Sequence, residues 1–177
     1  MIEKETRRPE RSSGSSAPRG DRAFELLYRD TRDDLYSYLA YLLGDASLAE
    51  EVAAQAFERA FRKRHTFDAR RGDIRAWLFR IARNAGIDEL RRGNRQSVLD
   101  IAVVDPRLAA GPDCTDDRID VVAALRDLAP RQRELVALKF FAGLGNREIA
   151  RVLGQSESNV GSQLHRAIEK LREALDA

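Results

Sequence analysis

The stretch DIRAWLFRIARNAGIDELRR at residues 73–92 predicts an amphipathic helix. At 3.6 residues per turn one face is apolar and comprises Ile74, Trp77, Leu78, Ile81, Ala82 and Ala85. A second face carries Arg80, Arg83, Asn84 and Arg91. Asp73 follows Gly72 and is placed to cap the N-terminus of the helix. From this helix alone, the basic face is either simply solvated or bound to an anionic partner.

Composition predicts a cytoplasmic protein of one domain or two small ones. Of the 177 residues, 43% are hydrophobic and 34% are charged, which is typical of soluble helical proteins. No apolar run approaches the roughly 18–20 residues needed to cross a bilayer, and charged residues follow Met1 too closely for a secretory signal. The single cysteine, Cys114, allows no internal disulfide and no Cys-based metal site. We therefore expect no membrane insertion, no metal and no cofactor.

Charge is divided unevenly along the first half of the chain. Residues 21–58 contain three arginines and nine acidic residues, whereas residues 59–92 contain eleven Lys or Arg and four acidic residues. This division predicts two surfaces of opposite sign, one for a basic partner and one for phosphate.

The hydrophobic pattern predicts an all-α protein with two small helical domains joined by a flexible linker. Residues 1–20 read as a disordered tail, residues 21–92 as the first domain, 93–118 as the linker and 119–177 as the second domain. In the first domain, one helix closes at Gly44 and a second starts with a capping box from Ser47 to Glu50. The aspartates of the first helix lie on its outer side: Asp30, Asp33 and Asp34.

The loop at residues 65–72 places Phe67 among charged residues. An aromatic residue in such a loop is either a hydrophobic anchor or a platform on which an unpaired base stacks. The loop alone leaves both interpretations open. Trp77 shares the apolar stripe of the following helix, so we expect it to lie mainly in the core.

The second domain has the pattern of a helix-turn-helix. After a short helix at 119–128, Pro130 opens a helix that ends near Gly143. A helix at 146–153, a turn at Gly154 and a long helix from Ser156 follow. The expected internal core is Ile149, Ala150, Leu153, Val160 and Leu164. A plain helical hairpin within a bundle is the alternative.

Taken together, the two halves resemble bacterial sigma factors of the sigma-70 family, in the two-domain group called extracytoplasmic function (ECF). Three strings carry the resemblance: AEEVAAQAFERAF at 49–61, WLFRIARNAGIDELRR at 77–92, and LAPRQRELVALKFFAGLGNREIARVLGQSESNVGSQLHRAIEKLREAL at 128–175. The resemblance covers residues 21–92 and 119–175.

The resemblance implies that the first domain is region 2, which binds the clamp helices of the polymerase beta-prime subunit and melts the promoter minus-ten element. The residues matched to polymerase contact are Asp33, Asp34, Glu50, Glu51 and Gln55. Phe67, Arg70 and Arg71 match the loop that captures a flipped base, and Asn84 matches the position that reads it. The basic residues of the same helix are assigned to DNA as well: Arg80, Arg83, Arg91 and Arg92.

The second domain would be region 4, which reads the minus-thirty-five element and contacts the polymerase beta flap. The residues that the resemblance assigns to DNA contact in this domain are Ser158, Asn159, Ser162, Gln163 and Arg166. The chain departs from the family pattern at Ala54, where glutamine is usual, and at Gly161 and Gln163, where cations are frequent. We therefore expect weak binding to the upstream element. An anti-sigma factor is a further partner that the resemblance implies.

Two alternatives come from other functional classes. The first is a free-standing helix-turn-helix regulator, which would leave the acidic face and the Phe67 loop unexplained. The second is an enzyme that binds a metal through Asp30, Asp33 and Asp34, but no second set of ligands accompanies them. The interpretation that best fits all the patterns is a sigma factor without an active site of its own.

Overall fold

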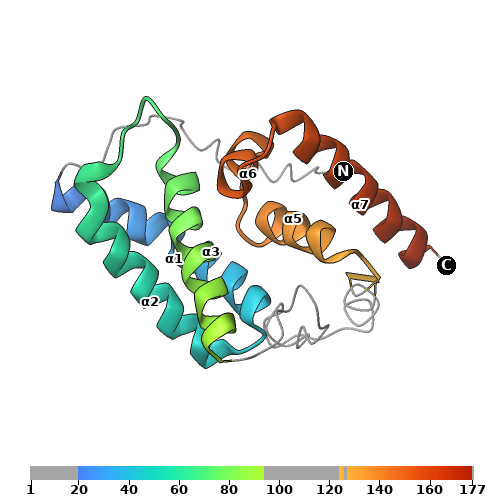
Figure 1. The fold of residues 1–177 in the computed structure, drawn as a ribbon, viewed down its shortest axis with the longest axis horizontal. Helices are drawn as coiled ribbons and strands as arrows, with labels where there is room; N and C mark the ends of the chain where they lie inside the picture. The colour runs from blue at the N-terminus through green and yellow to red at the C-terminus, as the bar shows by residue number, and fades with distance from the viewer. Residues whose placement is uncertain (1–19, 94–123, 126, 177) are drawn as a thin grey trace, which may run out of the picture.

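A computed structural model describes residues 20–93, 124–125 and 127–176, and its described residues form helices and no strands. Helices α1 (Asp21–Leu43), α2 (Ala46–Lys63) and α3 (Ile74–Arg92) make a first helical group. Helices α5 (Pro130–Phe140), α6 (Asn146–Leu153) and α7 (Glu157–Leu175) make a second. Figure 1 shows the two groups side by side, with α3 facing the second group. The predicted tail except Gly20, and the predicted linker except Gly93, lie outside the described residues.

Local signals place the ends of the helices in the first group. Gly44 adopts a φ of 67°, the left-handed conformation that closes α1 as predicted. The capping box predicted from Ser47 is wrong, because Asp45 caps α2 and accepts a hydrogen bond from the Leu48 N–H at 3.0 Å. Asp73 caps α3 as predicted, accepting from the Arg75 N–H at 2.6 Å.

Helix α3 packs against three neighbours, namely α1, α2 and α6. Of the predicted apolar stripe, Leu78, Ala82 and Ala85 are buried, whereas Ile74, Trp77 and Ile81 are only partly buried at its edge. The buried residues that the stripe omitted are Ala76, Phe79, Gly86 and Leu90. A helix that packs on one neighbouring layer needs one apolar stripe. Because α3 has three neighbours, more of its surface is buried than the periodicity indicated.

The second group contains the predicted helix-turn-helix. Pro130 is the first residue of α5, Gly154 closes α6 with a φ of 65°, and the Ser156 side chain caps α7 by accepting from the Asn159 N–H. The predicted internal core is confirmed, with Leu153 alone only partly buried. Of the short helix predicted at 119–128, the structure describes only a part, in which Ala124 and Leu125 are helical and buried.

The two groups pack directly on each other. Helix α3 contacts α6 and α1 contacts α5, and the buried residues of both groups form one continuous hydrophobic cluster. The rings of Tyr41 and Phe141 stack across the boundary with centroids 4.8 Å apart. The sequence predicted two domains joined by a flexible linker, and it did not predict this interface. That division into domains stays a prediction, whereas the described state is closed.

Candidate nucleic-acid interface

The loop before α3 is folded by its own side chains. A short 3-10 helix, η1 (Arg64–Thr66), leads into Phe67. The Asp68 carboxylate accepts from the Arg70 N–H at 3.0 Å, and the Asp68 carbonyl accepts from the Arg71 N–H at 2.9 Å. This turn keeps Phe67 and the start of α3 close together. The arginines of the loop remain exposed.

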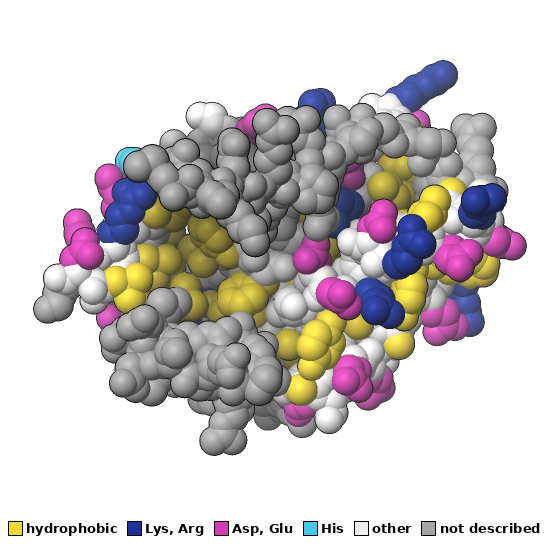
Figure 2. Space-filling view, turned by 180° about the vertical axis from the view of Figure 1, so that it is seen from behind, with side chains coloured by type: hydrophobic (Ala, Val, Ile, Leu, Met, Phe, Trp, Pro, Cys, Tyr) yellow, Lys and Arg dark blue, Asp and Glu magenta, His cyan; other side chains and the backbone are white. Residues whose placement is uncertain are grey.

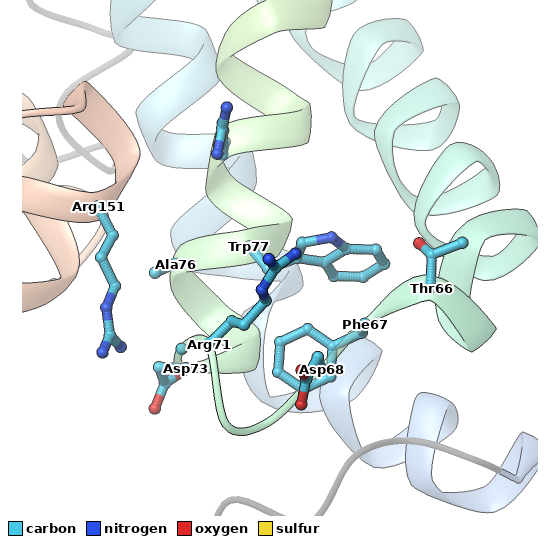
Figure 3. Close-up of a pocket in the computed structure, with 10 residues that line it drawn as sticks. Thr66, Phe67, Asp68, Arg71, Asp73, Ala76, Trp77 and Arg151 are labelled. Atoms are coloured by element: carbon cyan, nitrogen blue, oxygen red, sulfur yellow. The ribbon is translucent and has the colours of Figure 1, made fainter.

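Phe67 and Trp77 form one wall of a pocket of about 350 Å³ at the start of α3. Their ring centroids are 5.5 Å apart and the ring planes are tilted by 53°. Figure 3 shows the two rings on one side of the pocket, with Arg71 beside them and Arg151 reaching in from α6 on the other side. Hereafter we call this the aromatic pocket; its lining is Thr66, Phe67, Asp68, Arg71, Gly72, Asp73, Ala76, Trp77, Arg80 and Arg151.

The aromatic pocket bears on both interpretations of Phe67. Its ring packs against Trp77, as an anchor would, and it also lines the pocket. Stacking of a base on this ring stays a prediction. Trp77, which the sequence assigned mainly to the core, is only partly buried and lines the pocket as well. Aromatic faces bordered by guanidinium groups are the surface on which an unpaired base stacks while its phosphates are neutralised.

The exposed polar residues of α3 continue in line from this pocket. Arg80 and Asn84 follow Trp77 by three and seven residues, so they occupy the same side of the helix. Both are exposed, and Asn84 forms no hydrogen bond with the described residues. At the end of the helix Arg91 and Arg92 are also exposed, and Arg92 pairs with Glu89 at 2.9 Å.

Arg83 does not belong to this exposed surface. Its Nε donates to the Glu134 carboxylate of α5 at 2.5 Å, and its side chain is mostly buried between the helical groups. Burial by itself lowers the pKa of Arg83, but the hydrogen bond and the charge of Glu134 outweigh that effect. The pKa is therefore raised and the guanidinium stays charged. The expectation that Arg83 lies free on a basic face is wrong for this closed state.

The predicted polar residues of α7 lie near its N-terminus. Ser158, Asn159 and Ser162 are exposed, as is Arg166 one turn further on, whereas Gln163 is partly buried. Gly161 faces the start of α6, because a Cβ built there would lie 3.7 Å from Asn146 Nδ2. A Cβ at position 161 therefore fits without displacing a neighbour.

Two of the five predicted polymerase residues, Asp33 and Glu50, line a shallow groove of about 270 Å³ between α1 and α2. Hereafter we call this the α1–α2 groove; its lining is Tyr28, Arg32, Asp33, Tyr36, Glu50, Ala53, Ala54 and Phe57. Figure 2 shows hydrophobic side chains set among acidic and basic ones on the side where α1 and α2 lie. Such a mixture of aromatic and acidic groups suits a basic protein partner.

The other predicted polymerase residues, Asp34, Glu51 and Gln55, do not line this groove. Glu51 is exposed and accepts from the partly buried Gln55 at 3.3 Å. Asp34 was expected on the outer side, but it is partly buried and accepts from Arg75 at 3.1 Å. Asp30 and Asp33 instead lie near Arg29 and Arg32. Among the described residues, no three His, Cys, Asp or Glu side chains are grouped as metal ligands.

Comparison with known families places both helical groups. The model of sigma-70 region 2 matches residues 27–96, and a model of sigma-70 region 4 matches residues 118–171. The chain belongs to the sigma-70 family. The first match ends just beyond α3, and the second contains the helix-turn-helix, so the two candidate DNA surfaces fall in different regions of the sigma factor.

Relatives from several bacteria are ECF sigma factors. The chain is 33% identical over 159 residues to the ECF RNA polymerase sigma factor BldN of Streptomyces coelicolor, covering 86% of this chain and 60% of BldN. It is 29% identical over 167 residues to the ECF RNA polymerase sigma factor SigK of Mycobacterium ulcerans, covering 90% and 89% of the two chains. The chain thus spans less than two thirds of BldN but most of SigK.

A solved structure supports the fold. The sigma factor RpoE of Bartonella quintana, in complex with the anti-sigma factor NepR, superposes with a TM-score of 0.67 at 23% identity. The superposition covers 87% of this chain and 97% of RpoE. In the present chain, none of the helices in the described residues is long and apolar enough to cross a membrane.

Sequence reasoning missed three side chains at these surfaces: Trp77, Glu134 and Arg151. Trp77 carried a signal, since an aromatic residue at the edge of an apolar stripe can face outward. Glu134 and Arg151 carried none, because both reach surfaces of the first helical group from far along the chain.

Proposed function

We propose that this ECF sigma factor binds core RNA polymerase through the α1–α2 groove and opens promoter DNA at the aromatic pocket. The observation that carries the proposal is the pairing of Phe67 with Trp77 in a pocket bordered by Arg71 and Arg80. Extruding a base costs a few kcal/mol of lost stacking, and a pocket of aromatic and basic groups offsets that cost.

Residue roles follow from position. Phe67 and Trp77 would stack on the extruded base, and Arg70, Arg71 and Arg80 would neutralise its flanking phosphates. Asn84 would read a base edge, because its amide both donates and accepts hydrogen bonds. Arg91 and Arg92 would contact the backbone beyond the end of α3.

The second helical group would place the exposed start of α7 in the major groove of the upstream element. Ser158, Asn159, Ser162 and Gln163 would face base edges, and Arg166 would lie nearer to phosphate. Contact with the polymerase beta flap is assigned to this group as well. The domain limits, 21–92 and 119–177 with a linker between them, stay a prediction.

We propose that the chain acts as an initiation factor in the cytoplasm and contributes no catalytic group. An anti-sigma factor is a proposed further partner, since RpoE was solved with NepR. The free-standing regulator is not favoured. Such a regulator needs no polymerase-binding module, whereas residues 27–96 of this chain match sigma-70 region 2.

Asp33→Arg is expected to weaken binding to core polymerase by at least about tenfold, since a reversed charge in the α1–α2 groove would repel a basic partner. Asp30→Arg is the matched control, because Asp30 is exposed on the same helix and does not line the groove. Binding is measured by fluorescence anisotropy of the labelled chain with purified core enzyme. Equal effects of the two variants would remove the groove as the polymerase site.

A further inference from the structure

A buried carboxylate joins the two helical groups. The Glu134 side chain is only 2% exposed and accepts from Arg83 of α3 and from Arg131 of its own helix at 2.8 Å. A buried charge is tolerated when it is paired, and losing one partner leaves the other charge uncompensated. Glu134 therefore favours the arrangement in which Arg83 stays beside it.

Two further contacts cross the same boundary. Arg75 of α3 donates to the Ala142 carbonyl at 2.7 Å as well as to Asp34. Phe141 stacks on Tyr41 of α1. Phe140, its neighbour in sequence, points away and is 62% exposed. These contacts lie on α1 and α3, so the second group is held by polar and aromatic contacts together.

The interface is nevertheless imperfect. The hydroxyl groups of Tyr38 and Tyr41 are buried and have no hydrogen-bond partner among the described residues. Burial raises the pKa of Tyr41 to about 12, and burial together with the nearby charge of Glu134 raises the pKa of Tyr38. Both hydroxyls therefore stay protonated at neutral pH. Burying a hydroxyl without a hydrogen-bond partner costs free energy, and this cost disfavours the closed state. A buried ion pair adds little net stability, so such an interface can open.

Closure affects the two candidate surfaces differently. Arg83 is paired with Glu134. Arg151 lines the aromatic pocket, and its guanidinium packs closely on Gly72, 3.3 Å from the position that a Cβ of Gly72 would take. Among the described residues, in contrast, the α1–α2 groove is lined only by its own two helices. The described part of the second group thus occupies part of the proposed DNA surface and does not reach the proposed polymerase surface.

We propose that the Glu134–Arg83 pair is an interdomain latch that holds the free chain closed and withholds its minus-ten surface from DNA. Release of the latch would free Arg83 and withdraw Arg151 from the aromatic pocket, so that only the open chain binds an unpaired strand fully. The DNA half of this inference rests on the proposed function, whereas the closed state itself does not.

The test uses the full chain and two kinds of variant. Glu134→Gln removes the buried charge, and Glu173→Gln makes the same charge change at an exposed site of α7. Phe141→Ala removes the stack on Tyr41, and Phe140→Ala is its exposed neighbour. Small-angle X-ray scattering gives the radius of gyration, and anisotropy gives the affinity for a short single-stranded DNA of degenerate sequence.

We expect Glu134→Gln and Phe141→Ala each to increase the radius of gyration and to tighten DNA binding by about tenfold, with both controls near wild type. An unchanged radius in both interface variants would overturn the latch. Opening without tighter DNA binding would overturn the withholding of the minus-ten surface. Binding to core polymerase is measured in parallel. If neither the wild-type chain nor any variant binds core polymerase, the proposed function is contradicted instead.

Discussion

Asn84→Ala is expected to lower open-complex formation by about ten- to a hundredfold, because a side-chain contact to a base edge contributes about 1–3 kcal/mol. Asn84 is exposed, in line with Trp77 on α3, and forms no hydrogen bond with the described residues. Its loss should therefore leave the fold intact. Affinity for core polymerase should stay within about twofold, since the α1–α2 groove does not include this residue.

Permanganate reactivity of unpaired thymines measures open complexes, and anisotropy with core enzyme measures polymerase binding. Asp88→Ala is the control, because Asp88 is exposed one turn further along the same helix. Equal losses in both assays would show that Asn84 supports the structure of α3, and its assignment as a base reader would then be wrong.

Gly161→Lys combined with Gln163→Arg is expected to tighten binding to promoter duplex and to steepen its salt dependence. Each new phosphate contact should add about 0.9 to the magnitude of the log–log salt slope, so the pair should add about 1.8. The backbone at position 161 accepts a Cβ, which would make only an ordinary contact with Asn146. The measurement is duplex affinity of the full chain at several salt concentrations.

Gly161→Ala separates charge from helix stability in this experiment. Replacing glycine inside a helix by a good helix former such as alanine or lysine adds up to about 1 kcal/mol of stability, so thermal melting is followed for both variants. The alanine variant should melt higher with an unchanged slope. If the charged variant also keeps the wild-type slope, this face of α7 does not approach DNA, and the second helical group serves protein contact instead.

Helix ends and the helix-turn-helix were predictable because their signals are local. Asp73, Gly44 and Ser156 cap or close helices where the sequence predicted them. The start of α2 was not, since Asp45 and Ser47 are both good caps. Asp45 prevails because Gly44 has already ended α1, so α2 begins at the next residue.

The environment of α3 could not be predicted from its periodicity. A hydrophobic stripe shows one buried face, whereas α3 has three neighbours, one of them more than fifty residues away in sequence. Gly86 illustrates this, since a Cβ there would lie 2.9 Å from Leu42 of α1. Its glycine reflects a close helix crossing rather than a break. Arg83 likewise read as a surface cation until the position of Glu134 was known.

Run-off transcription with core enzyme on genomic fragments tests the central claim most directly. With this chain added, the account predicts transcripts from discrete, mappable start sites, and it predicts that Asp33→Arg strongly reduces them while Asp30→Arg does not. Absence of chain-dependent transcripts, with duplex binding retained, would contradict the account and identify a DNA-binding regulator that works without polymerase.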